Sequence, residues 1–247
     1  MIVIPDIHGR SFWKEVVKGK ENEEIIFLGD YLDPYTGRED ITKEDALENF
    51  KEIIEFKKAH PDNVILLIGN HDCTYAISKS ICMCRTDMKN FKTIEKAFND
   101  NRELFTFGIV KEIDGINYVF SHAGLHKVYA QLVFGKRKAP NVKVAIKKFN
   151  EAYQNNDMEV LKKLMFVSSY RGGWGPIGSI VWADVREWIN SEEYKNTYQI
   201  FGHTGAKDCL ITEKFAMLDC KRAFIFDNGK IYELDGSLAT VHLLNEL

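Results

Sequence analysis

Residues 25–33 read Ile25-Ile26-Phe27-Leu28-Gly29-Asp30-Tyr31-Leu32-Asp33. A short apolar run that stops at a glycine is typical of a strand buried on both faces. In α/β sheets the ligand crevice lies beyond the carboxyl ends of such strands. The stretch therefore predicts an α/β fold, with Asp30 and Asp33 at a functional site on the loop that follows a central strand.

The same pattern of an apolar run followed by Asp, Asn or His recurs four more times. Runs 1–5, 63–68, 116–120 and 197–201 lead to Asp6-Ile7-His8-Gly9, Gly69-Asn70-His71-Asp72, Ser121-His122-Ala123-Gly124 and Gly202-His203-Thr204-Gly205. One Asp-x-His motif alone is more often a turn or a helix cap than a metal site. Five strand ends that each supply such residues indicate a metal site built where the strands end.

The segments between these runs predict the other elements. Thr42 followed three residues later by Asp45 marks a helix start, and Asp114-Gly115 predicts a hairpin turn between strands 105–113 and 116–121. Helical spacing is expected at 10–18, 74–80, 88–99, 125–134, 141–155 and 157–164, and further strands at 215–219, 222–226 and 230–233. Segment 166–183 has no regular period, and a loop of that length is usually functional.

Composition excludes several classes of partner. Lys and Arg number 33 against 36 Asp and Glu, so the net charge of −3 offers no basic footprint for nucleic acid. The longest apolar run, 64–68, is far below the ~20 residues that span a bilayer. Because the first predicted strand begins at Met1 with no leader ahead of it, we expect a cytoplasmic protein. The five cysteines lack CxxC spacing, so we expect reduced thiols.

Six residues at the strand ends are candidate metal ligands: Asp6, His8, Asp30, Asn70, His122 and His203. A mixture of carboxylate, amide and imidazole without thiolate suits manganese, iron or zinc. Two ions about 3.5–4 Å apart need a shared ligand, and Asp30, after a central strand, is placed to bridge them.

Together the five motifs resemble the signatures of the calcineurin-like metallophosphoesterases, over residues 1 to about 205. They are most similar to the branch of the Ser/Thr protein phosphatases and diadenosine tetraphosphatases. The resemblance implies a four-layer α/β/β/α sandwich of two mixed sheets flanked by helices. It also implies a single domain over 1–247, with a mainly helical insertion and loop at about 125–183.

The resemblance assigns a role to each motif. Asp6, His8 and Asp30 would hold a first divalent cation, and Asp30, Asn70, His122 and His203 a second, most often Mn²⁺ with Fe or Zn as alternatives. A hydroxide bridging the cations would attack phosphorus in line. His71, oriented by Asp33, would be the general acid that protonates the leaving oxygen. Gly205 stands where many nucleases of the superfamily carry a second histidine, so the first cation would hold more water.

The sequence departs from the family pattern after Asp33. The Ser/Thr phosphatases carry a phosphate-binding arginine there, whereas this chain has Pro34. Arg38, Arg85 and Arg171 are the candidate replacements. We favour Arg171, because its Gly-rich loop could bring a planar guanidinium to the phosphate. A second departure is Asp72, where the family usually has a glutamate.

Three functions are compatible with these motifs. The first is a two-metal phosphomonoesterase acting on phosphoserine or phosphothreonine in proteins. The alternative, favoured by the Phe-Gly-His-Thr motif at 201–204 and the aromatic loop 170–178, is a hydrolase of dinucleoside polyphosphates or other nucleotide phosphoesters. A non-catalytic scaffold would have broken ligands, and none of the six is broken. The expected partner is a phosphorylated protein or a small phosphoester, with neither nucleic acid nor membrane indicated.

Overall fold

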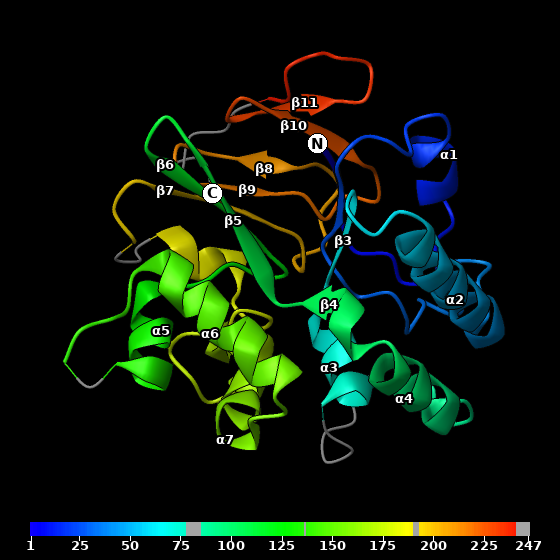
Figure 1. The fold of residues 1–247 in the computed structure, drawn as a ribbon, viewed down its shortest axis with the longest axis horizontal. Helices are drawn as coiled ribbons and strands as arrows, with labels where there is room; N and C mark the ends of the chain where they lie inside the picture. The colour runs from blue at the N-terminus through cyan, green and yellow to red at the C-terminus, as the bar shows by residue number, and fades with distance from the viewer. Residues whose placement is uncertain (78–84, 136, 190–192, 241–247) are drawn as a thin grey trace.

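Two mixed β-sheets form the centre of the computed structural model, which describes residues 1–77, 85–135, 137–189 and 193–240 (Figure 1). The first sheet has the strand order β11-β10-β1-β2-β3-β4. Strands β1 to β4 run parallel, and β10 and β11 continue the sheet antiparallel beyond β1. Its strands are β1 (Ile2–Ile4), β2 (Ile25–Phe27), β3 (Val64–Leu67), β4 (Phe105–Thr106), β10 (Phe224–Asp227) and β11 (Lys230–Glu233).

The second sheet has the order β5-β6-β7-β9-β8. Its central strands β6, β7 and β9 are parallel, and its two edge strands are antiparallel to their neighbours. These strands are β5 (Gly108–Ile113), β6 (Ile116–Ser121), β7 (Thr197–Phe201), β8 (Leu210–Ile211) and β9 (Phe215–Met217).

Helices lie on opposite sides of the sheet pair. Figure 1 shows α1, α2 and α4 on one side and α5, α6 and α7 on the other. The helices are α1 (Trp13–Val17), α2 (Lys43–Ala59), α3 (Asn70–Ala76), α4 (Phe91–Asp100), α5 (Lys127–Phe134), α6 (Val142–Gln154) and α7 (Met158–Leu161). The prediction of two mixed sheets flanked by helices is confirmed.

The alternation of side chains along the central strands explains the layers. Successive residues of a strand point to opposite faces, and every residue of β1 is fully buried. Ile2 and Ile4 join the core beneath the helices, which includes Phe50 of α2. Val3 faces the other way and packs with Phe120 of the second sheet. A strand covered on both faces must be apolar throughout, as the sequence of β1 is.

Two predicted elements differ from the structure, and one strand of the structure was not predicted. The run 105–113 is two strands, because the chain leaves the first sheet after β4 and enters the second at β5. The helix predicted at 74–80 begins earlier, at Asn70, so the third motif forms its first turn, and positions 78–80 lie outside the described residues. Strand β8 was not predicted, since two residues carry no periodic signal.

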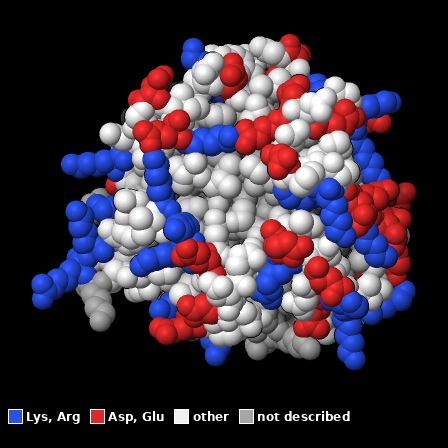
Figure 2. Space-filling view, viewed as in Figure 1, with Lys and Arg blue, Asp and Glu red and all other residues white. Residues whose placement is uncertain are grey.

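Charges of both signs are interspersed over the face drawn in Figure 2, around a largely uncharged centre. This pattern agrees with the near balance of 33 basic and 36 acidic residues. None of the helices in the described part of the chain combines the length and hydrophobicity that a transmembrane span needs.

Candidate metal centre

Five loops, three from the first sheet and two from the second, bring their polar side chains to one place. Parallel strands end at the same edge of a sheet, so the loops after β1, β2 and β3 are neighbours, as are those after β6 and β7. Two clusters of ligand atoms result, in each of which all atoms lie within 4.8 Å of one another. Asp6, His8 and Asp30 form the first cluster, and Asp30, His122 and His203 form the second.

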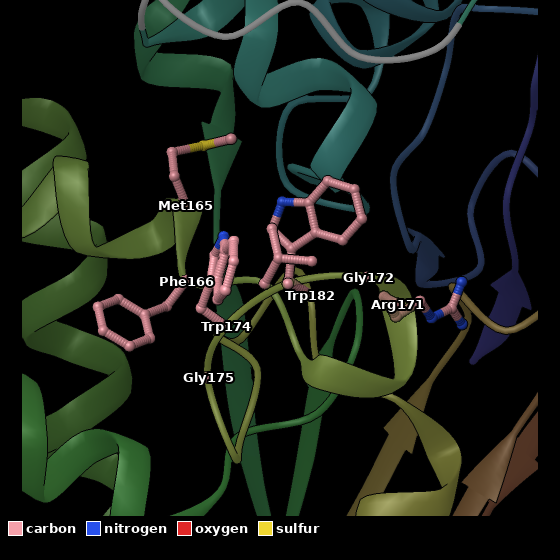
Figure 3. Close-up of a pocket in the computed structure, with 9 residues that line it drawn as sticks. Met165, Phe166, Arg171, Gly172, Trp174, Gly175 and Trp182 are labelled. Carbon is pink, nitrogen blue, oxygen red and sulfur yellow. The ribbon is translucent and has the colours of Figure 1, made fainter.

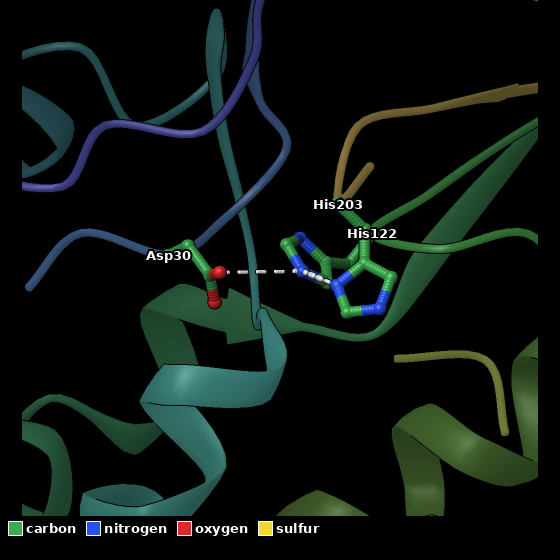
Figure 4. Close-up of side chains that lie close together, drawn as sticks. All are labelled: Asp30, His122 and His203. Carbon is green, nitrogen blue, oxygen red and sulfur yellow. Dashed lines mark hydrogen bonds and ion pairs between the residues drawn. The ribbon is translucent and has the colours of Figure 1, made fainter. Parts of the chain in front are cut away.

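Asp30 lies between the two clusters. Its Oδ2 is 3.6 Å from Nε2 of His8 and 3.5 Å from Nε2 of His122. Figure 4 shows Asp30, His122 and His203 converging from different segments of the chain. The amide oxygen of Asn70 completes the second cluster, 2.9 Å from Nε2 of His122 and 2.9 Å from Nδ1 of His203. All six predicted ligands are therefore brought together.

Backbone carbonyls orient two of the imidazole rings. Nδ1 of His8 lies 2.9 Å from the carbonyl of Leu32, and Nδ1 of His122 lies 2.8 Å from that of Leu28. If Nδ1 donates to the carbonyl, Nε2 presents a lone pair to the cluster, which is the arrangement of a metal-binding histidine. His203 faces the cluster through Nδ1 instead, only 3.1 Å from Nε2 of His122. Two ring nitrogens and an amide oxygen that converge in this way fit a cation.

Burial sets the charge of these groups. It lowers the pKa of His8 and His203 well below the usual value and also lowers the pKa of His122, so these rings are neutral at pH 7. Burial, with the nearby carboxylates of Asp6 and Asp72, raises the pKa of Asp30 well above its usual value. A divalent cation would bind the lone pairs of the neutral imidazoles and offset the repulsion between the neighbouring carboxylates.

The backbone at the centre is strained and closely packed. His8, Asp30 and His203 adopt positive φ angles of 44°, 54° and 65°. Non-glycine residues in this region cost on the order of 1–3 kcal/mol each and persist mainly at functional sites. At Gly69 and Gly202 a Cβ atom would stand 2.1 Å from Oδ1 of Asp30 and Oδ1 of Asp6, respectively. Only glycine lets the backbone approach these carboxylates so closely.

His71 stands beside the centre and outside both clusters. Its Nδ1 is 2.7 Å from Oδ2 of Asp33, and the other oxygen of that carboxylate accepts a hydrogen bond from Tyr75. The Asp33 carboxylate therefore fixes the orientation of the ring. Asp72 braces the loops instead, because its carboxylate accepts hydrogen bonds from the backbone amides of Asp30, Tyr31 and Gly69.

The three candidate arginines occupy different positions. Nη2 of Arg85 is 3.3 Å from Nε2 of His71, and its guanidinium lies over the ring of Tyr35, 3.8 Å from the centroid. Arg171 forms an ion pair of 2.9 Å with Asp184 and donates a hydrogen bond to Thr204. Arg38 lines a cavity of about 320 Å³ beside His8. Of the three, Arg85 is next to the His71 ring.

An aromatic pocket adjoins the second cluster. The ring of Trp182 meets His203 edge to face, with the centroids 5.5 Å apart. Trp182, Phe166 and the fully exposed Trp174 line this pocket of about 560 Å³. In Figure 3 the side chain of Arg171, from the same loop, points away from both indoles. The aperiodic loop 166–183 thus borders the centre, as predicted.

Sequence reasoning missed Asp219, which follows β9. This side chain is only 7% exposed and lines the same cavity as His8. Burial, and then the charge of Asp6, raises the pKa of Asp219 to about 8. No motif marked this residue, because a single aspartate after a short strand is usually a turn residue.

Comparison with known proteins identifies one matching family. The sequence model of the family described as calcineurin-like phosphoesterase matches residues 1–206. A search among curated proteins finds no match.

Solved structures of cold-active protein-tyrosine phosphatases share the fold, and a further phosphatase structure is less similar. A cold-active protein-tyrosine phosphatase from the psychrophile Shewanella sp. aligns with a TM-score of 0.60 and 14% identity, over 98% of this chain and 80% of that one. Another structure of a cold-active protein tyrosine phosphatase aligns with a TM-score of 0.59 and 12% identity, over 96% of this chain and 76% of that one. A protein serine/threonine phosphatase from Saccharomyces cerevisiae aligns with a TM-score of 0.49 and 12% identity, over 94% of this chain and 79% of that one. At these identities the likeness concerns the fold alone.

Proposed function

The chain belongs to the calcineurin-like phosphoesterases, and from this premise we propose that it is a two-metal phosphomonoesterase acting on phosphoserine or phosphothreonine in proteins. Membership confirms the prediction of a metal-dependent phosphoric ester hydrolase. The observation that carries the finer proposal is the pair of ligand clusters sharing Asp30, with His71 beside them. A cytoplasmic location is proposed on sequence grounds.

The six clustered side chains would hold the cations. Asp6, His8 and Asp30 are assigned to the first cation, and Asp30, Asn70, His122 and His203 to the second. Their oxygen and nitrogen donors favour manganese, with iron or zinc as alternatives. When bound, two such cations supply positive charge for the phosphoryl oxygens and lower the pKa of water toward ~7.

His71 is assigned as the group that gives a proton to the leaving oxygen. Asp33 holds its Nδ1, so Nε2 is the nitrogen left to face a substrate. A serine or threonine alkoxide is a poor leaving group and needs this proton, whereas an aryl oxide leaves without it. His71 therefore matters most for phosphoserine and phosphothreonine.

Arg85 is the better candidate for binding the phosphate, although the sequence favoured Arg171. Its guanidinium lies beside Nε2 of His71, and stacking on Tyr35 fixes its plane. Arg85 also donates through Nε to the carbonyl of Asp33, whereas Arg171 is held by the carboxylate of Asp184, by Thr204 and by the carbonyl of His203. A planar guanidinium beside the proton donor suits two-point contact with a phosphate.

The first test is hydrolysis by the purified, metal-free protein. We expect p-nitrophenyl phosphate to be cleaved after Mn²⁺ is added and cleavage to stop when EDTA is present. A matched control is the protein with Asp30→Asn, which removes the shared ligand and should stay inactive with Mn²⁺. A wild-type protein that takes up two cations and remains inert on every phosphoester would overturn the proposal.

The aromatic pocket favours a second candidate, hydrolysis of dinucleoside polyphosphates. Trp174 is fully exposed at a pocket that reaches His203 through Trp182. Stacking of a base on an aromatic side chain is worth about 1–3 kcal/mol, or roughly 5- to 150-fold in binding. Trp174→Ala should raise KM by this factor for diadenosine tetraphosphate and leave p-nitrophenyl phosphate unaffected, with Leu132→Ala, an exposed apolar residue on α5, as the control.

A substrate panel separates the two candidates. We would compare kcat/KM for phosphoserine and phosphothreonine peptides with that for diadenosine tetraphosphate, at equal Mn²⁺. Higher values for the peptides support the protein phosphatase, and a higher value for the dinucleotide supports the second candidate.

A further inference from the structure

Asp219 places a carboxylate on the open side of the first ligand cluster. It follows β9, far in sequence from the residues Asp6, His8 and Asp30 of that cluster. It shares the wall of a cavity of about 320 Å³ with His8, Arg10 and Tyr35. The same cavity therefore reaches both a proposed ligand of the first cation and this carboxylate.

The Asp219 carboxylate has no hydrogen-bond or ion-pair partner among the residues that the structure describes. Two of the basic side chains that line the cavity bind another carboxylate. Arg10 binds Glu39 at 2.8 Å, and Lys221 binds the same carboxylate at 2.6 Å. Buried polar groups are almost always paired, so an unpaired carboxylate at 7% exposure points to a missing ligand such as an ion.

Asp219 also fills the space beside Gly205. A Cβ atom at position 205 would lie 3.3 Å from Oδ2 of Asp219, closer than most side-chain contacts. By the resemblance described above, position 205 is where many nucleases and phosphodiesterases of the superfamily carry a second histidine. In this chain the glycine leaves room, and a carboxylate from another loop occupies it.

We propose that Asp219 supports the first cation from its open side, in the space beside Gly205, by holding water there. This inference rests on the proposed two-cation function. Because Asp219 lies outside the compact cluster of Asp6, His8 and Asp30, it acts by accepting hydrogen bonds from water on the open side of that cation.

The test is a calorimetric titration of the metal-free protein with Mn²⁺, which gives the affinity of each cation site. Asp219→Asn keeps the shape of the side chain and removes its charge. Supporting groups around a metal typically contribute tenfold to a hundredfold in affinity, so one of the two sites should weaken by about that factor. His8→Asn and His122→Asn identify the first and second sites, and Asp219→Asn should weaken the site that His8→Asn removes. The control is Asp227→Asn, the same change at an exposed position of β10.

Thermal unfolding gives a second readout. Without metal, Asp219→Asn should unfold at the wild-type temperature or above it, because an unpaired buried carboxylate is removed. Adding Mn²⁺ should raise the unfolding temperature of the variant less than that of the wild-type protein. A lower unfolding temperature without metal together with a full gain from Mn²⁺ would mean a purely structural carboxylate and overturn the assignment.

Failure of this inference is distinguishable from failure of the proposed function. Two wild-type sites whose affinities Asp219→Asn leaves unchanged would overturn the role of Asp219 alone. A wild-type protein that takes up no cation would overturn the proposed function and this assignment with it.

Discussion

Single side chains at the centre divide into those that would hold cations and those that would handle the substrate. His71 belongs to the second kind, because Asp33 orients it and neither ligand cluster includes it. The resemblance to the family implied this division, since the motif Gly69-Asn70-His71 would place a ligand and a proton donor side by side. In space the two point differently because the motif forms the first turn of α3.

His71→Asn should lower kcat on phosphoserine peptides by about 10²- to 10⁴-fold, because the leaving alkoxide loses its proton donor. The loss on p-nitrophenyl phosphate should be much smaller, and uptake of Mn²⁺ should be unchanged. Rates on both substrates and metal content check this, with His60→Asn at the end of α2 as the control. Equal losses on both substrates would contradict the role of a proton donor.

Arg85→Lys should raise KM for phosphoesters at least tenfold, because a lysine cannot reproduce two-point contact with phosphate. Arg171→Lys should have a smaller effect on KM, since Arg171 already binds Asp184 and Thr204. Steady-state kinetics of both variants on one substrate make the comparison. A larger rise in KM for Arg171→Lys than for Arg85→Lys would make Arg171 the phosphate-binding residue. Sequence could not rank these arginines, because their distances to His71 depend on how the loops fold.

At the scale of the elements, the start of α2 is a predicted feature that the structure confirms. The capping box of α2 was predicted from Thr42 and Asp45 and is present, with the Asp45 amide donating to Thr42 Oγ1 at 3.0 Å. The run 105–113 was mispredicted as one strand, because an apolar sequence does not reveal which sheet each half joins. Phe107, fully buried between β4 and β5, marks the point of transfer.

Thr42→Ala should lower the free energy of unfolding by about 1 kcal/mol, because the cap of α2 is lost. Urea denaturation measures the change. Thr93→Ala, at an exposed position inside α4, is the matched control and should be neutral or slightly stabilising. Equal destabilisation by both variants would show that the cap contributes nothing specific.

Glu39 joins two loops beside the centre by binding both Arg10 and Lys221. The hydrogen bond from Arg10 is the main cause that lowers the pKa of Glu39 to about 2. A depressed carboxyl pKa stabilises the folded state above the unfolded pKa near 4.5, and this contribution is lost as pH falls toward 2.

Glu39→Gln should therefore destabilise the protein by about 1 kcal/mol at pH 7, allowing for solvent screening. The difference from wild type should shrink as pH drops from about 4.5 and vanish near pH 2. Urea denaturation at several pH values gives this difference. A difference in the free energy of unfolding between wild type and variant that stays constant from pH 7 to pH 3 would contradict the ion-pair explanation.

At the scale of the whole molecule, the centre connects the two sheets. Asp6, Asp30 and Asn70 come from loops of the first sheet, and His122 and His203 from loops of the second. The sequence predicted this architecture because each motif follows its own strand. It could not predict that Asp219 approaches from a sixth loop, since that position depends on the course of the chain after β9.

Removing the cations should lower the unfolding temperature. A ligand at a hundred times its dissociation constant stabilises by about 2.7 kcal/mol, which corresponds to roughly 5–10 °C per cation for a chain of this size. Differential scanning calorimetry with EDTA and then with excess Mn²⁺ measures the shift. A His8→Asn and His122→Asn double variant is the control and should not respond. Identical curves for wild type with and without Mn²⁺ would contradict a metal that links the sheets.

The position of β1 has a consequence for synthesis on the ribosome. β1 lies between β2 and β10, with Ile2 paired to both Ile25 and Ile225. β1 thus leaves the exit tunnel well before β10 and keeps one hydrogen-bonding edge open until β10 has been translated. Nascent chains in this state expose an unpaired apolar edge, which is what chaperones recognise and what drives aggregation. Late completion of the first sheet is therefore built into the order of the strands.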